Sequence, residues 1–425
     1  MGTGTSEKEC RLPKLPKRPE NFPDIYEFKL LTPMIGGGVY AGYIDQDQPV
    51  RASAIRGALR FWWRLLQFGA NPSLEEMKKQ EADIWGRAAD HEEEKENGRS
   101  HVAVCVKKLH FPKAIEYFES KNKTIKGSPY VFFPLKEDGN RNWQLKATEY
   151  SDEPAFSVGI TYSPNLTEEK KKQVEMSLTL WANFGGVGAR TRRGCGSIFC
   201  DELAFENEDE LASSLAGTGI QILYKKISGQ DVKSDIDTEW RKLVENLKDF
   251  RQIKKDDHNK FSASLWPEAR SIWDNEDNFP RAALGMPIIF HNLKRDGNRY
   301  NNDPKTNPTL APCDTKQKAK SVIMRMASPV IMRMVKLKNN SLYAVVLILP
   351  GYAQELKKHT IRITQLREGE KDRDISPNKI LHPHFSGKAK EKIGKYFKDD
   401  QGAVGAFKEY LNEKWKKEER VNEHE

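Results

Sequence analysis

The chain has 425 residues, in which 70 lysines and arginines outnumber 61 aspartates and glutamates and give a formal net charge of +9. This length allows a sizeable core and favours two domains. No run of about 18 apolar residues marks a membrane span, and the polar start is not a signal peptide, so we expect a cytoplasmic protein without a membrane partner. The charge favours a polyanionic partner, nucleic acid first, although a basic protein without such a partner also fits it.

The N-terminal half predicts a split βαβ order of strands and helices. After a tail at 1–23, alternating polarity predicts a strand at 25–31, and a helix follows at 55–67 with Ser53 as its N-cap. The remaining expected elements are strands at 101–109, 130–134, 155–162 and 197–203 and a helix at 168–183. This is the order of a ferredoxin-like domain, the fold that RRM modules also use. The charged segments 87–100 and 113–127 lack an apolar face and are expected to be insertions.

The C-terminal half predicts a second unit. We expect strands at 220–224, 286–291, 322–335 and 342–349 and helices at 235–250 and 403–417. The polar segment 292–320 between them is long enough to be a functional or a disordered loop, and one role for it is to order on a partner. The motif Ile-Met-Arg-Met occurs at 323–326 and again at 331–334, and predicts two short strands whose arginines point away from the methionines, a direction that suits phosphate contact. The predicted domains are 24–205 and 206–425.

The first predicted helix has an apolar face and a cationic face. At 100° per residue, its apolar stripe holds Ile55, Leu59, Trp62 and Leu66. Steps of four place three arginines on the opposite side, Arg56, Arg60 and Arg64. No carboxylate within the helix pairs with them, so they are candidates for RNA contact, with ion pairing to acids elsewhere in the fold as the alternative. Trp63 lies at the border of the stripes, where it either stacks on a base or covers the helix edge.

A glycine-arginine loop, residues 185–196, is the second candidate for RNA binding. Its glycines allow backbone amides to approach an anion, notably at Gly186 and Gly188. Its three guanidinium groups offer paired donors to phosphate: Arg190, Arg192 and Arg193. It has neither a complete dinucleotide-binding fingerprint nor a Walker A ending, and a plain connector with surface arginines is the alternative. An earlier glycine run is also suited to close approach: Gly36, Gly37 and Gly38.

Motifs for catalysis, metals and cofactors are missing from the sequence. The five cysteines lack the spacing of a disulfide framework or a zinc site. His382 and His384 form a short pair without further ligands nearby, which favours a surface loop over a metal site. We therefore expect no metal, no cofactor and no small-molecule substrate. A metal-free ribonuclease needs only one well-placed histidine, so that class of enzyme remains an alternative.

Three motifs together carry a resemblance to a known family. They are TPMIGGG at 32–38, PVR at 49–51 with SAIRGALRFWWR at 53–64, and FGGVGARTRRGCGSI at 184–198. Weaker similarity recurs at 284–288 and 327–330, whereas 87–130 and 292–320 carry none. In combination, these motifs resemble the first RAMP-superfamily subunit of the type III-B (Cmr) CRISPR RNA-silencing complex.

The resemblance implies an α+β chain of tandem ferredoxin-like (RRM-like, RAMP) domains with insertions. It also implies an RNA-binding structural subunit that holds the 3′ region of guide RNA (crRNA) and target RNA beside other Cmr subunits, for antiviral defence. No catalysis is implied, because in that family a different, repeated subunit cuts the target. Two alternatives remain: a metal-independent endoribonuclease that processes guide RNA, and an assembly cap whose arginines meet acidic subunits.

Overall fold

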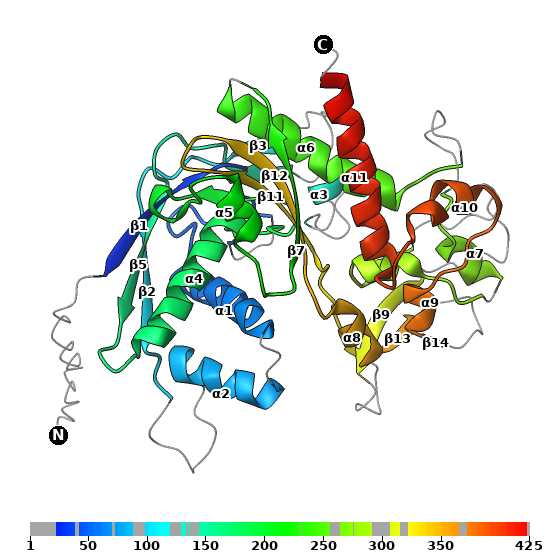
Figure 1. The fold of residues 1–425 in the computed structure, drawn as a ribbon, viewed down its shortest axis with the longest axis horizontal. Helices are drawn as coiled ribbons and strands as arrows, with labels where there is room; N and C mark the ends of the chain where they lie inside the picture. The colour runs from blue at the N-terminus through cyan, green and yellow to red at the C-terminus, as the bar shows by residue number, and fades with distance from the viewer. Residues whose placement is uncertain are drawn as a thin grey trace, which may run out of the picture.

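The computed structural model describes residues 23–38, 42–69, 73–87, 98–119, 129–132, 135, 144–229, 231–255, 264–274, 276–290, 307–314, 322–364 and 372–422. Residues 1–22 of the expected tail lie outside this part of the chain, as do 88–97, 120–127, 292–306 and 315–320 of the expected insertions and loop. Helices and antiparallel sheets alternate along the chain (Figure 1), which confirms the α+β class.

The N-terminal sheet has four antiparallel strands in the order β2-β5-β1-β6. Its strands are β1 (Asp24–Leu30), β2 (Val102–Lys108), β5 (Phe156–Tyr162) and β6 (Ile198–Phe199). Helix α1 (Ala52–Phe68) connects β1 to β2, and α4 (Glu168–Phe184) connects β5 to β6; the two helices pack against each other. Strand, helix, two strands, helix and strand is the split βαβ alternation that the sequence predicts.

Three local predictions in this half are wrong. Helix α2 (Leu74–Trp85) was not expected, because most of its residues are polar; the sequence signal for it is a capping box between Ser73 and Glu76. Where a strand was expected at 130–134, the structure has the helical turn α3 (Pro129–Phe132). Its residues Val131 and Phe132 are buried in the core. The N-cap of α1 is Arg51 and not Ser53. A separate ribbon pairs β3 (Ile115–Glu119) with β4 (Gln144–Ala147).

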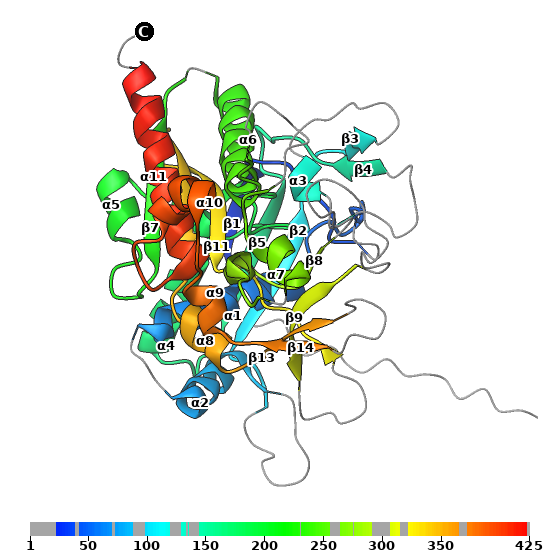
Figure 2. The same ribbon diagram turned by 90° about the vertical axis from the view of Figure 1, so that its right-hand side faces the viewer.

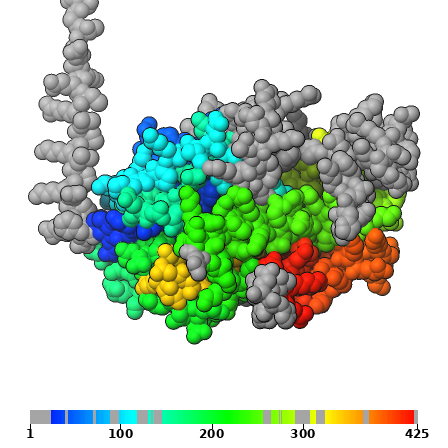
Figure 3. Space-filling view, turned by 90° about the horizontal axis from the view of Figure 1, so that it is seen from above, coloured from blue at the N-terminus to red at the C-terminus, as the bar shows by residue number. Residues whose placement is uncertain are grey.

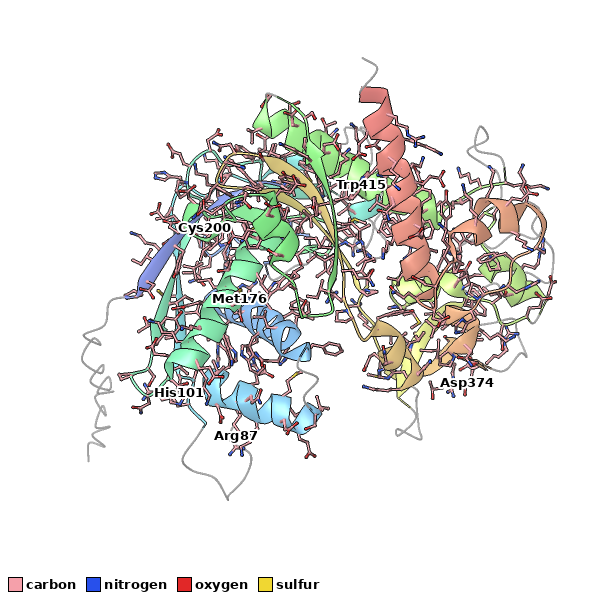
Figure 4. The ribbon with its side chains drawn as sticks, in the orientation of Figure 1. Arg87, His101, Met176, Cys200, Asp374 and Trp415 are labelled. Carbon is pink, nitrogen blue, oxygen red and sulfur yellow. The ribbon has the colours of Figure 1, made fainter. Side chains whose placement is uncertain are left out.

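A central sheet, in the order β11-β12-β7, connects the two halves. Its strands are β7 (Gln221–Ile227), β11 (Val330–Lys336) and β12 (Leu342–Ile348). Period-2 alternation sends Ile331 and Val335 into the N-terminal core, and Met332 and Met334 into the C-terminal core. Helices α6 (Val232–Arg251) and α11 (Gly402–Asn422) contact each other in the C-terminal half (Figure 1), and Trp415 of α11 is buried there (Figure 4).

A third sheet completes the C-terminal half (Figure 2), in the order β10-β9-β13-β14 with β8 also pairing β9. Its strands are β8 (Ile288–Ile289), β9 (Thr309–Asp314), β10 (Val322–Ile323), β13 (Thr360–Thr364) and β14 (Arg373–Ile375). The strand predicted at 322–335 is instead β10 and β11 in different sheets; Pro329 between them has no amide donor for a continuous ladder.

Short helices fill the remaining connections. They are α5 (Glu208–Ser213), α7 (Glu268–Trp273), α8 (Tyr352–Lys357), α9 (Asn378–Leu381) and α10 (Gly387–Lys392), with 3₁₀ turns at Asp201–Leu203, Pro280–Leu284 and Gly394–Tyr396. The first of these turns replaces the end of the strand expected at 197–203. The segments around α9 and α10 lie at the opposite end of the molecule from β1 (Figure 3).

Candidate nucleic-acid interface

A cavity of about 450 Å³ lies where the two glycine loops meet the beginning of α1. Its wall is formed by Gly37, by residues between 49 and 58, and by the distant segment 186–191. The lining residues are Gly37, Pro49, Val50, Arg51, Ser53, Ala54, Ile55, Ala58, Gly186, Val187, Gly188 and Thr191. The structure therefore brings together three predicted site residues, Gly37, Gly186 and Gly188, and adds Arg51, Ser53 and Thr191, which were not predicted.

Close backbone packing holds the two glycine loops together. The amide of Ala189 donates to the carbonyl of Ile35 at 2.6 Å. At Gly188 the backbone has φ +80°, and a Cβ added there would lie 2.6 Å from the Ile35 oxygen. Only glycine adopts this conformation at this distance without strain. The sequence predicts that these glycines allow the backbone to approach an anion. In the structure, Gly188 allows the backbone of one loop to approach the backbone of the other.

Hydrogen-bond donors of α1 and of the glycine-arginine loop lie at the cavity, and the amides of Ala54 and Ile55 among them donate to the Arg51 carbonyl. Arg51 at the N-cap makes no capping bond with its side chain, and its guanidinium donates instead to the carbonyl of Gly37. The first turn of α1 contains no acidic residue. Within the described part of the chain, the amides of Gly186 and Gly188 donate no hydrogen bond. Free amides at a helix N-terminus, together with free loop amides, are the arrangement that binds phosphate and other anions.

The three arginines of the glycine-arginine loop are directed at protein backbone. The Arg190 Nε donates to the Val131 carbonyl at 2.8 Å, and the Arg193 Nη1 donates to the Val330 carbonyl at 3.0 Å. The guanidinium of Arg192 donates to the Ser328 carbonyl and lies over the Phe61 ring. Burial lowers the pKa of all three, that of Arg193 to about 9. Two of these arginines therefore attach the loop to the segment that leads into β11, and their contact with RNA stays a prediction.

The three arginines of α1 face the unexpected helix α2. Glu81 of α2, whose side chain is 8% exposed, pairs with the Arg60 Nε at 2.6 Å and with the Arg64 Nη2 at 2.7 Å. Burial alone would raise the pKa of Glu81, but hydrogen bonds from the two arginines outweigh it and lower this pKa. Arg56 donates to the carbonyl of Trp85 at the end of α2. Ion pairing, the alternative left open by the sequence, is present, and RNA contact by these arginines stays a prediction.

Trp63 is fully buried, so it belongs to the packed face of α1 and not to the border between its apolar and cationic faces. Its Nε1 donates to the Gln173 Oε1 of α4 at 2.9 Å. The α1–α4 contact encloses a wider part of α1 than the apolar stripe alone predicts. The indole ring is therefore not available for stacking on a base in this fold.

Arg333 of β11 was not among the predicted site residues. Its side chain is 1% exposed, and its Nη1 lies 3.4 Å from the Thr191 carbonyl and 3.3 Å from the Cys195 carbonyl. The sequence signal for it is the repeated Ile-Met-Arg-Met motif, whose alternation at 331–334 is confirmed, with the arginine opposite the methionines. The motif at 323–326 leaves its strand after Ile323.

Metal-binding clusters and membrane-spanning helices are both absent from the described ranges. No three His, Cys, Asp or Glu side chains there are placed to share a metal ion. None of the helices there has both the length and the apolar composition to cross a membrane. His382 and His384 follow α9, and neither lines the cavity.

Comparison with solved structures gives distant matches. The crystal structure of Cmr1 from Pyrococcus furiosus in its apo form aligns with a TM-score of 0.42 and 17% identity, over 76% of this chain and 86% of the other. A cryo-EM structure of the type III-B Cmr-beta complex bound to cognate target RNA contains a chain that aligns with a TM-score of 0.39 and 10% identity, over 82% of this chain and 96% of the other.

Comparison of sequences gives the family. The RAMP superfamily model matches residues 27–199. The CRISPR system Cmr subunit Cmr1-1 of Pyrococcus furiosus is 29% identical over 155 residues, which is 35% of this chain and 40% of that protein. Subunit Cmr1-2 of the same organism is 30% identical over 188 residues, 41% of this chain and 92% of that protein. The chain belongs to the Cmr1 family of Cmr subunits, within the RAMP superfamily.

Proposed function

We propose that this protein is an RNA-binding, non-catalytic subunit of a type III-B CRISPR effector complex that holds guide RNA (crRNA) and target RNA. The proposal includes a cytoplasmic location and contact with other Cmr subunits; the names of its relatives, both Cmr subunits, support the second of these. RNA would be held through its phosphates, which position a strand without reading its sequence.

The observation that carries the proposal is the composition of the cavity wall. Its polar donors are the free amides of Gly186 and Gly188, the beginning of α1 and the guanidinium of Arg51. No aspartate or glutamate is among the lining residues, so nothing there repels an anion. Small-ligand sites commonly enclose about 300–1,000 Å³, so this cavity has room for a nucleotide unit of an RNA strand.

The same wall supports binding without cleavage. Its side-chain functional groups are one guanidinium and two hydroxyls, on Arg51, Ser53 and Thr191. General acid–base catalysis needs a group that exchanges a proton near neutral pH, such as histidine or a carboxylate. None of the lining residues is of that type.

Two ferredoxin-like units are part of the proposal. The first is the β2-β5-β1-β6 sheet with α1 and α4. In the second half, β7, α6, β11, β12 and α11 follow the same alternation, and the order β11-β12-β7 corresponds to β2-β5-β1. The sheet of β8, β9, β10, β13 and β14 is then an addition to the second unit.

A charge reversal inside the cavity tests RNA binding. Ser53 lies in the first turn of α1, where a carboxylate stabilises a helix by about 0.3–1 kcal/mol. Ser53→Glu should therefore keep or raise stability while it repels phosphate. Gln67→Glu adds the same charge at the far end of α1, where it disfavours the helix slightly and lies away from the cavity.

Fluorescence anisotropy with a labelled single-stranded RNA, at several salt concentrations, gives the readout. Wild type and Gln67→Glu should bind with affinities that fall as salt increases, and Ser53→Glu should bind more weakly and with a smaller salt slope. Equal binding by all three proteins would reject the cavity as the RNA site. RNA cleavage by the purified protein in EDTA would instead support the ribonuclease alternative.

A further inference from the structure

Arg333 is a buried cation without a carboxylate partner among the described residues. Its side chain is 1% exposed, and its Nε and Nη2 make no hydrogen bond. Burial lowers its pKa to about 9, and the one nearby group that favours its charge is the Cys195 thiol. At neutral pH the guanidinium is therefore charged and only partly satisfied. A buried charge left in this state is strongly unfavourable in a folded protein.

The guanidinium of Arg333 lies directly behind the wall of the cavity. Its Nη1 is held by the carbonyl of Thr191, a lining residue. Its unpartnered Nη2 is directed at Gly186, another lining residue, so closely that a Cβ added to Gly186 would lie 1.9 Å from it. The unpartnered Arg333 Nη2 and the unpartnered Gly186 amide therefore lie close to each other at the cavity wall.

A second buried cation strengthens the positive field at this place. Arg193 is 8% exposed; burial and the cations Arg190, Arg251 and Arg192 lower its pKa, and Tyr130 acts in the opposite direction. Both buried arginines bind carbonyls across the junction between the glycine-arginine loop and β11. Charges in a low-dielectric interior act over longer distances than charges in water, so their field reaches the cavity.

We propose that Arg333 positions the glycine-arginine loop for RNA and that a phosphate bound in the cavity is its counter-ion, so that RNA binding stabilises the junction between the loop and β11. This inference rests on the proposed function and adds to it a linkage between occupancy of the cavity and docking of the two halves. A ligand that binds only the docked state stabilises that state in proportion to its affinity.

The repeated Ile-Met-Arg-Met motif provides a matched pair of variants. Arg333→Met replaces the buried guanidinium by an unbranched apolar side chain in a strand that already carries two methionines. Arg325→Met makes the same change at the exposed arginine of the other copy. Arg333→Lys keeps the charge and serves as the conservative variant. Each full-length protein is unfolded thermally with and without single-stranded RNA, and RNA affinity is measured in parallel.

Arg333→Met should unfold at or above the wild-type temperature without RNA, because an uncompensated buried charge is gone. With RNA it should lose most of the wild-type increase in melting temperature, and its affinity should fall by about tenfold or more, as expected when the counter-charge of a bound phosphate is lost. Arg325→Met should behave as wild type, and Arg333→Lys should recover part of the RNA-induced increase. A purely structural Arg333 would give the opposite pattern: a lower melting temperature without RNA and an unchanged increase with it.

Thiol labelling of the wild-type protein keeps the inference testable if Arg333→Met does not fold. Cys195 is buried at the junction, whereas Cys105 is exposed on β2. Saturating RNA should slow the modification of Cys195, located by mass spectrometry, and leave that of Cys105 unchanged. Equal rates for Cys195 with and without RNA would overturn the linkage. Failure of wild type and Arg325→Met to bind RNA at all would instead reject the proposed function.

Discussion

Gly186→Ala tests how tightly the glycine-arginine loop is packed on β11. An added Cβ would lie 1.9 Å from the Arg333 Nη2 and 2.4 Å from the Gly196 oxygen, against at least 3.4 Å in ordinary contacts. Neither neighbour retreats easily, because the guanidinium is held by two carbonyls and the Gly196 oxygen accepts from the Val187 amide at 3.0 Å. Overpacking of this kind costs about 1–3 kcal/mol, and two simultaneous clashes favour the upper part of that range.

Gly57→Ala is the matched control for this substitution. Gly57 lies within α1, and nothing stands within 4 Å of an added Cβ. Alanine there should stabilise the helix by about 0.5–1 kcal/mol, since glycine is a weaker helix former. The same chemical change thus has opposite expected signs at two positions in one half of the protein.

Urea unfolding, followed by tryptophan fluorescence, measures both effects. The midpoint should fall for Gly186→Ala and rise for Gly57→Ala. Adding Arg333→Met to Gly186→Ala removes one clash and leaves the other, so part of the lost stability should return and the two changes should not be additive. A Gly186→Ala protein with the wild-type midpoint would refute the packing on which the cavity wall depends.

Two further predictions concern α1. Glu81→Gln should destabilise the α1–α2 contact by about 1–2 kcal/mol at neutral pH. Because the folded-state pKa of Glu81 is lowered, its contribution is present above the ordinary carboxyl pKa and is lost as pH falls through the folded value. Wild type and Glu81→Gln should therefore converge in acid thermal denaturation, and a constant difference would contradict the ion pair. Trp63→Phe should cost about 0.5–1.5 kcal/mol through loss of the bond to Gln173 and leave RNA affinity unchanged; weaker RNA binding would support base stacking instead.

The comparison of Arg60 with Arg333 shows why site roles were harder to predict than elements. The periodicity that places Arg60 opposite the apolar stripe of α1 is local, and it was found in the sequence. Its partner Glu81 lies 21 residues further along the chain, in a mostly polar helix where the sequence does not distinguish it from the other charged residues. Arg333 lies 138 residues from the Cys195 carbonyl that holds it, so no spacing in the sequence connects them.

The sequence by itself determined the α+β class, the positions of β1, α1, α4 and α11, and the two glycine runs. Backbone angles and side-chain periodicity depend on residues that are close along the chain, so they can be predicted from the sequence alone. Tertiary structure alone decided that two loop arginines, Arg192 and Arg193, turn towards the segment that leads into β11 and that Arg51 and Ser53 share a cavity with Gly186. The physical reason is that a guanidinium binds any carbonyl, carboxylate or phosphate within reach, and only the packing of distant segments determines which of them is there.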